Sequence, residues 1–185
     1  MNLHLPKFSY LLTGKFFSTG LQAIFYLLFA FFLDPDTYGN LAYFIAIAGT
    51  VSTISRFGLN QSITISQAKN DQKLSDSINT LSLVTLGIGS FFLIFVDPII
   101  ALLCLSVSLF GMNIHNLIGL RKYQQYMWVD IVRGILLVLL PLILFHFFDF
   151  SGIIIGMMIA YFITSFQFLK SITFSNFSFN LIKKR

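Results

Sequence analysis

The sequence opens with an apolar run, Phe8–Leu33, that is long enough to cross a bilayer. About 20 apolar residues span the hydrocarbon core as an α-helix. Four polar residues recur along the run at intervals of four, three and four positions: Lys15, Thr19, Gln22 and Tyr26. On a helix they share one stripe. Because lysine and glutamine are costly in hydrocarbon, we predict that this stripe faces other helices or a water-filled cavity.

Composition places the whole chain in the membrane. Hydrophobic residues make up 56% of the 185 residues and charged residues only 10%, against about 25% charged residues in globular domains. We therefore predict an all-α membrane protein whose six transmembrane helices form three hairpins in one domain, residues 1–172. The expected helices are residues 8–33, 38–57, 78–96, 98–120, 128–148 and 151–172, with a cytoplasmic linker at 58–77 and a basic interfacial tail at 173–185.

The charges alternate from one connection to the next. Short acidic turns follow the first, third and fifth helices, and basic stretches follow the others, so that all 12 Lys and Arg residues fall on one side. The positive-inside rule then predicts that both termini are cytoplasmic. The basic tail is expected to contact anionic membrane lipid. Since topology explains the positive charge, no nucleic acid partner is predicted.

Lys15 and Arg56 each have two interpretations. Lys15 either lines a cavity or extends its ammonium group to the cytoplasmic interface, and Gln22 faces inward in both cases. Arg56 ends the second predicted helix, where it is either interfacial or at the mouth of a cavity.

His115 and Arg133 are likewise open to two interpretations. His115 is either a proton relay or a structural residue beside Asn113 and Asn116. Asp130 and Arg133 are three residues apart and can pair on one helix face. That pair either leaves Arg133 as a ligand for an anion or is purely structural.

The last predicted helix carries a small residue at every fourth position, which predicts a close-packing face for another helix. The residues are Gly152, Gly156, Ala160 and Thr164. No Ser-His-Asp arrangement, phosphate-binding glycine loop, aspartate pair or metal-ligand cluster can be identified in the sequence. We therefore expect a protein that is not an enzyme and has no metal or cofactor.

Three stretches carry a family resemblance. They are the opening helix from Leu12-Thr13-Gly14-Lys15 to its turn Asp34-Pro35-Asp36-Thr37-Tyr38-Gly39, the segment Arg56-Phe57-Gly58-Leu59, and the basic loop Gly119–Tyr126. They resemble the polysaccharide-biosynthesis flippases, the O-antigen-type members of the multidrug/oligosaccharidyl-lipid/polysaccharide exporter superfamily. The resemblance covers nearly the whole chain.

The resemblance implies a flippase that moves a lipid-linked oligosaccharide or polysaccharide precursor across the cytoplasmic membrane by alternating access. The headgroup would cross a cationic cavity in which Lys15, Arg56 and Arg133 face its pyrophosphate. The other candidate substrate-binding residues are Thr19, Gln22, Tyr26 and His115.

One departure from the family concerns the number of helices. Family members have two lobes of about six helices, and this sequence supplies one. The chain would be a fragment, a half that pairs with another chain or a second copy, or a lobe that has lost transport. A second hypothesis is a non-transporting interaction protein that docks a partner through Gly152–Thr164. An enzyme of lipid or glycan metabolism is the least favoured, because acid pairs are missing.

Overall fold

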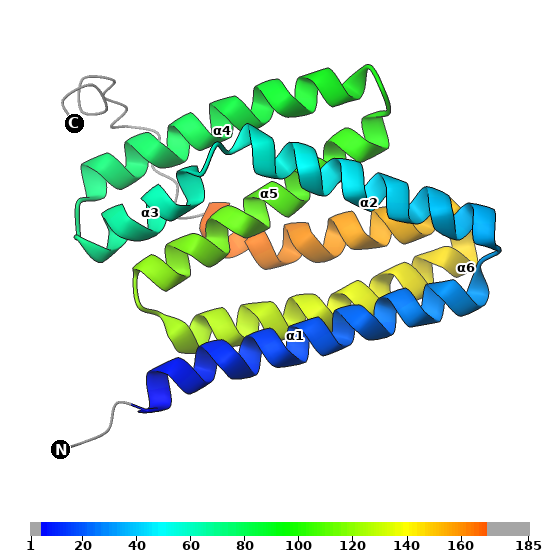
Figure 1. The fold of residues 1–185 in the computed structure, drawn as a ribbon, viewed down its shortest axis with the longest axis horizontal. Helices are drawn as coiled ribbons and strands as arrows, with labels where there is room; N and C mark the ends of the chain where they lie inside the picture. The colour runs from blue at the N-terminus through cyan, green and yellow to red at the C-terminus, as the bar shows by residue number, and fades with distance from the viewer. Residues whose placement is uncertain (1–4, 170–185) are drawn as a thin grey trace.

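The computed structural model describes residues 5–169, and every regular element within them is a helix (Figure 1). The helices are α1 (Leu5–Phe32), α2 (Pro35–Ser55), α3 (Leu59–Ala68), α4 (Gln72–Ile94), α5 (Pro98–Gly119) and α6 (Tyr123–Leu169). The predicted tail at 173–185 lies outside the described residues.

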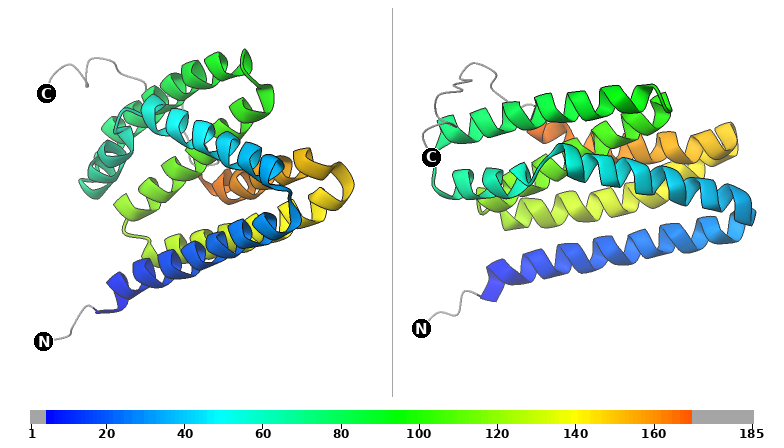
Figure 2. Two further views of the ribbon diagram at one scale, coloured as in Figure 1. Left: turned by 45° about the vertical axis from the view of Figure 1, so that its right-hand side comes forward. Right: turned by 45° about the horizontal axis from the view of Figure 1, so that its top comes forward.

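The long helix α6 is two helical limbs joined by a sharp bend. Phe148 (φ −130°, ψ 15°) and Asp149 (φ 48°, ψ −135°) leave helical geometry. The second limb returns beside the first, as both Figures 1 and 2 show. The break falls between the two predicted helices at 128–148 and 151–172.

The connections sort by charge onto the two ends of the bundle. The acidic α1–α2 and α4–α5 turns and the bend of α6 lie at one end, on the right of Figure 1. The α3–α4 connection, which carries Lys69 and Asp71, and the basic α5–α6 connection lie at the opposite end. Connections that alternate in charge along the sequence therefore alternate between the two ends of the bundle.

Four helices within residues 5–169 are long and apolar enough to cross a membrane, or five if the bent pair α2 and α3 counts as one span. The prediction of an all-α membrane protein is confirmed. The predicted count of six spans in three hairpins stays a prediction.

Residues 58–77, which the sequence analysis assigned to a linker, are largely helical. Ile63 of α3 is fully buried against Ile78 of α4 and Met112 of α5. The axis bends by 55° between α2 and α3, where Phe57 and Gly58 adopt positive φ angles of 42° and 73°. Ile63 is the one buried apolar side chain of α3, and this signal was too weak to find beside the many polar residues of the helix.

The two limbs of α6 approach each other closely at two glycines. Gly156 of the second limb lies against Pro141 of the first, so that a Cβ at position 156 would come within 2.6 Å of the proline Cα. A Cβ at Gly152 would collide with the carbonyl oxygen of Leu144. α5 is the central helix, because it packs against α2, α3, α4 and α6.

We expect Gly156→Ala to destabilise the protein by about 1–3 kcal/mol, because the added methyl group meets backbone rather than a movable side chain. Thermal unfolding in detergent micelles measures the effect. Gly20→Ala is the matched control, since nothing lies within 4 Å of a Cβ there and alanine favours the helix. Equal melting temperatures for the two variants would contradict this packing.

The α1–α2 turn predicts a pH dependence. Asp34 accepts hydrogen bonds from Thr37 Oγ1 at 2.7 Å and from Thr37 N at 3.0 Å, and these bonds lower the pKa of its carboxyl group. A lowered folded-state pKa stabilises the protein above the unfolded pKa of about 3.9, and this stability is lost as the pH falls through the lower folded value. Asp34→Asn, which still caps α2, should therefore lose less stability than the wild type between about pH 5 and pH 2. The measurement is the free energy of unfolding at several pH values. If it falls equally with pH in the wild type and in Asp34→Asn, the expectation is refuted.

Candidate functional site

Arg133 forms a buried ion pair with Asp130 at the junction of α1, α5 and α6. Its Nη2 lies 2.9 Å from Asp130 Oδ1, and its Nε donates to the same oxygen at 3.0 Å. Ser18 of α1 donates to Asp130 Oδ1 at 3.0 Å and accepts a hydrogen bond from Arg133 Nη2. The residues that the spacing of three predicted to pair therefore also tie α1 to α6.

Two aromatic rings complete the surroundings of Arg133. The guanidinium carbon lies 4.9 Å from the ring centroid of Phe110 on α5 and 5.8 Å from that of Tyr161 on the second limb of α6. A desolvated cation is attracted to such ring faces. Only 6% of Arg133 and 3% of Asp130 is exposed, and Asp130 Oδ2 is buried without a hydrogen-bond partner.

Arg56 is also buried, with 9% of its surface exposed, but its surroundings differ. Its Nε donates to the carbonyl oxygen of Ser52 at 2.7 Å, and its Nη2 donates to Ser52 Oγ at 2.9 Å. Ser108 of α5 donates to the same Ser52 hydroxyl at 2.7 Å. Within residues 5–169 the structure gives Arg56 no carboxylate partner, so no side chain of this part of the chain neutralises its charge.

The bend after α2 sets the depth of Arg56. α3 continues from the bend toward the end of the bundle that carries the basic connections (Figure 1). If α2 and α3 form one span, Arg56 lies within that span rather than at its end. Gly111 of α5 makes room for the guanidinium group, because a Cβ at position 111 would collide with Arg56 Nη1.

His115 lies one helical turn beyond Gly111 and is half-buried. Its Nδ1 is 3.2 Å from Thr64 Oγ1 of α3, and the same hydroxyl donates to the His115 carbonyl oxygen. His115 also interacts electrostatically with Arg56. Arg56 and His115 are therefore brought together at one face of α5.

The predicted stripe of α1 is divided between two environments. Lys15 and Thr19 are exposed, whereas Gln22 and Tyr26 are half-buried. The face of α1 that packs against the first limb of α6 is the neighbouring one, with Gly14, Ser18, Phe25 and Phe29. A Cβ at Gly14 would lie 2.9 Å from the Cα of Met127, which shows how closely the two helices approach.

The four small residues of the last predicted helix are all buried by other parts of the chain. Gly152 and Gly156 meet the first limb of α6, and the carbonyl oxygen of Thr164 accepts a hydrogen bond from Asn113 of α5 at 2.8 Å. Helices of this chain already cover the face that these residues form.

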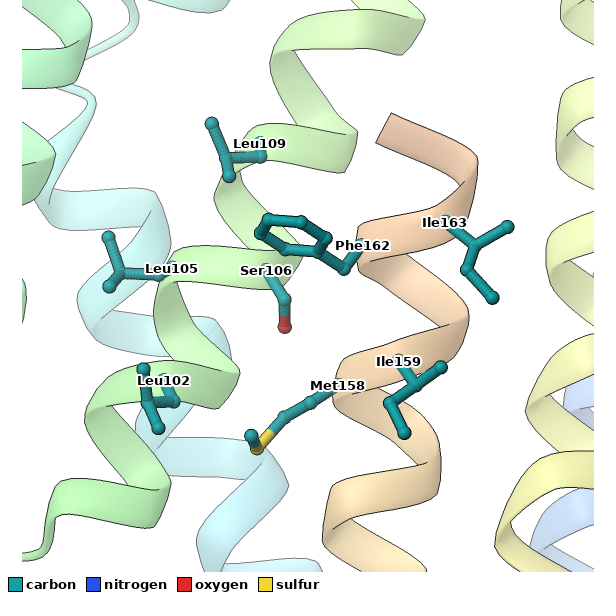
Figure 3. A pocket seen from close by; sticks show the side chains of 8 residues that line it. All are labelled: Leu102, Leu105, Ser106, Leu109, Met158, Ile159, Phe162 and Ile163. Atoms are coloured by element: carbon teal, nitrogen blue, oxygen red, sulfur yellow. The ribbon is translucent and has the colours of Figure 1, made fainter. Parts of the chain in front are cut away.

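An apolar groove of about 310 Å³ separates α5 from the second limb of α6 (Figure 3). Its lining is Leu102, Leu105, Ser106, Leu109, Met158, Ile159, Phe162 and Ile163. The one hydroxyl group in this lining, Ser106 Oγ, donates to the carbonyl oxygen of Leu103 at 2.8 Å. The lining therefore offers no free polar group for a charged headgroup.

Sequence reasoning assigned no site role to several side chains that surround the two arginines, namely Ser18, Ser52, Ser108, Phe110 and Tyr161. A usable signal existed for Ser18, because Gly14 and Ser18 are small residues four positions apart, a spacing typical of close helix packing in membranes. Within residues 5–169 no group of three His, Cys, Asp or Glu side chains could hold a metal ion.

These features define a multi-pass α-helical membrane protein with two buried arginines. A family model described as "Polysaccharide biosynthesis protein" matches residues 5–185, so the chain belongs to that family. Neither a curated protein nor a solved structure matches the chain significantly.

We predict that substitutions of Arg133 and Asp130 have strongly non-additive effects on the free energy of unfolding. Removing one partner leaves the other charge buried and unpaired, at a cost of about 3–5 kcal/mol. We expect Arg133→Gln to destabilise the protein by about that amount, and the double variant with Asp130→Asn to be more stable than Arg133→Gln alone. Unfolding in detergent gives the four free energies of the double-mutant cycle. Additive effects would mean that the pair is not energetically coupled.

Proposed function

We propose that this chain is one lobe of a flippase that carries a lipid-linked oligosaccharide or polysaccharide precursor across the cytoplasmic membrane by alternating access. Members of its family are generally transporters or flippases rather than enzymes. The two limbs of α6 count as separate spans in this proposal, which gives six, and both termini are cytoplasmic. A second chain or a second copy supplies the other lobe.

The observation that carries the proposal is the unneutralised charge of Arg56. A buried cation without a counterion is costly in a low-dielectric interior. A diphosphate headgroup would supply the missing negative charge and accept charge-assisted hydrogen bonds from the guanidinium group. The Ser52–Ser108 hydroxyl pair at the guanidinium group would contribute further polar contacts, and His115, one turn beyond Gly111 on α5, would add another.

Lys15 and Arg133 take different parts in this proposal. Lys15 is exposed on α1, with Thr19 beside it, where a second lobe would convert that surface into one wall of a cavity. Gln22 and Tyr26 continue the wall toward the interior. Arg133 is a second site for the headgroup once its hold on Asp130 is released.

A non-transporting docking role rested on the small-residue face of Gly152–Thr164. Since helices of this chain cover that face, it offers no free surface to a partner. Transport is therefore the better-supported proposal.

The test is flipping of a lipid-linked oligosaccharide in proteoliposomes that contain the chain and its second lobe. We expect Arg56→Gln to lower the rate about tenfold or more, since a lost charge-assisted hydrogen bond costs about 1.5–3 kcal/mol. Neutralisation of Lys15 or Arg133 should also slow flipping. Lys69→Gln, which removes an exposed cation at the α3–α4 connection, is the control and should leave the rate unchanged. Unchanged flipping in all three neutralised variants would remove the proposed site.

A further inference from the structure

A basic cavity of about 340 Å³ lies at the end of the bundle where α1 begins and where α5 connects to α6 (Figure 1). Its lining is Tyr10 of α1 with Arg121, Lys122, Tyr123, Gln124 and Gln125. Two cations, two phenolic hydroxyl groups and two amides therefore surround one space, and the lining contains no carboxylate. Neither Arg121 nor Lys122 forms an ion pair with a carboxylate of residues 5–169. The cavity therefore suits an anionic group.

An exposed apolar stripe runs along α6 from this cavity. Trp128 follows Gln124 and Gln125 by four and three positions, so it lies on their side of the helix, about 6 Å further along the axis. The stripe continues at intervals of four, three, four and four residues, and 40–57% of the surface of each member is exposed. Its members are Trp128, Val132, Ile135, Leu139 and Ile143. A cationic cavity at the end of the helix is thus continuous with an apolar face of the same helix.

This combination favours an amphipathic ligand. A free phosphate ion would use the cavity alone, whereas a phospholipid has a charged phosphate for the cavity and apolar acyl chains for the stripe. Tyrosine and tryptophan side chains are typical of the membrane–water interface, where phospholipid headgroups lie. Lys and Arg side chains at that depth attract anionic lipids. A zwitterionic phospholipid fits less well, because its own cation would lie beside Arg121 and Lys122.

We propose that the cavity and the stripe together form a binding site for one anionic phospholipid. Arg121 and Lys122 bind the phosphate through charge-assisted hydrogen bonds, and the Tyr10 and Tyr123 hydroxyl groups donate to other headgroup oxygens. An acyl chain lies against Trp128 and the residues that follow it in the stripe. This site goes beyond the proposed transport function and does not depend on it.

Trp128 is the one tryptophan of the chain, so its fluorescence reports on this stripe. The experiment places the full chain in phosphatidylcholine vesicles and adds, in separate series, phosphatidylglycerol or phosphatidylcholine with brominated acyl chains, which quench tryptophan on contact. We expect half-maximal quenching at a mole fraction about tenfold lower for phosphatidylglycerol, since each basic side chain at an anionic surface contributes about fivefold. Equal quenching by the two lipids would overturn the proposal. Quenching by neither would also overturn it, because protein would then cover the stripe.

Substitutions separate a binding site from a general attraction of the basic surface for anionic lipid. The double variant Arg121→Gln with Lys122→Gln should lose the preference for phosphatidylglycerol. Lys69→Gln is the matched control, because it removes an exposed cation at the same end of the bundle but outside the cavity, and it should keep the preference. A preference that persists in the double variant, or that is lost equally in Lys69→Gln, would overturn the proposal.

Inorganic phosphate distinguishes the lipid from a free ion. Millimolar phosphate, compared with chloride at the same ionic strength, should leave the quenching by brominated phosphatidylglycerol unchanged. If phosphate abolishes the preference while chloride does not, the cavity binds the free ion and the assignment to a phospholipid is overturned.

Discussion

The cost of placing charge in a low-dielectric interior governs how the helices of this protein meet. Arg133 is accommodated by Asp130 on its own helix, Ser18 on α1, the Phe110 ring on α5 and Tyr161 on the second limb of α6. A buried cation that loses such partners is strongly destabilising. The same guanidinium group therefore contacts α1, α5 and both limbs of α6 at one place in the interior.

Arg56 has different partners from Arg133. Its oxygen partners come from Ser52, on the same helix, and Ser108 extends that contact to α5. Neutral oxygen atoms solvate a cation without cancelling its charge. Arg133 is thus paired with a carboxylate, while Arg56 is contacted by neutral oxygen atoms of the described residues.

The fold class, the order of the helices and the acidic turns could be predicted from the sequence, because apolar length and charge position determine them. Asp130 and Arg133 could be paired from spacing along one helix. The packing face of α1 was assigned wrongly, although the spacing of Gly14 and Ser18 indicated it. A polar stripe containing Lys15 suggested one face, but close approach at Gly14 and Ser18 selected the neighbouring face, since helices in membranes pack through small residues.

Contacts between helices were harder to predict, for a physical reason. The meeting of Arg56 with Ser108 and Gly111, or of Arg133 with Phe110 and Tyr161, depends on how each helix is rotated about its axis. That rotation is set by all the side chains of an interface together. α3 was missed because one buried residue, Ile63, anchors a polar segment.

The missing side chain at position 111 has an evolutionary consequence. A Cβ at position 111 would force the guanidinium group of Arg56 to move from its present place. The two positions should therefore vary together among homologous sequences, with a larger residue at 111 appearing where 56 has become shorter. Such co-variation would show that the Arg56 side chain and the residue at position 111 compete for the same volume between their helices.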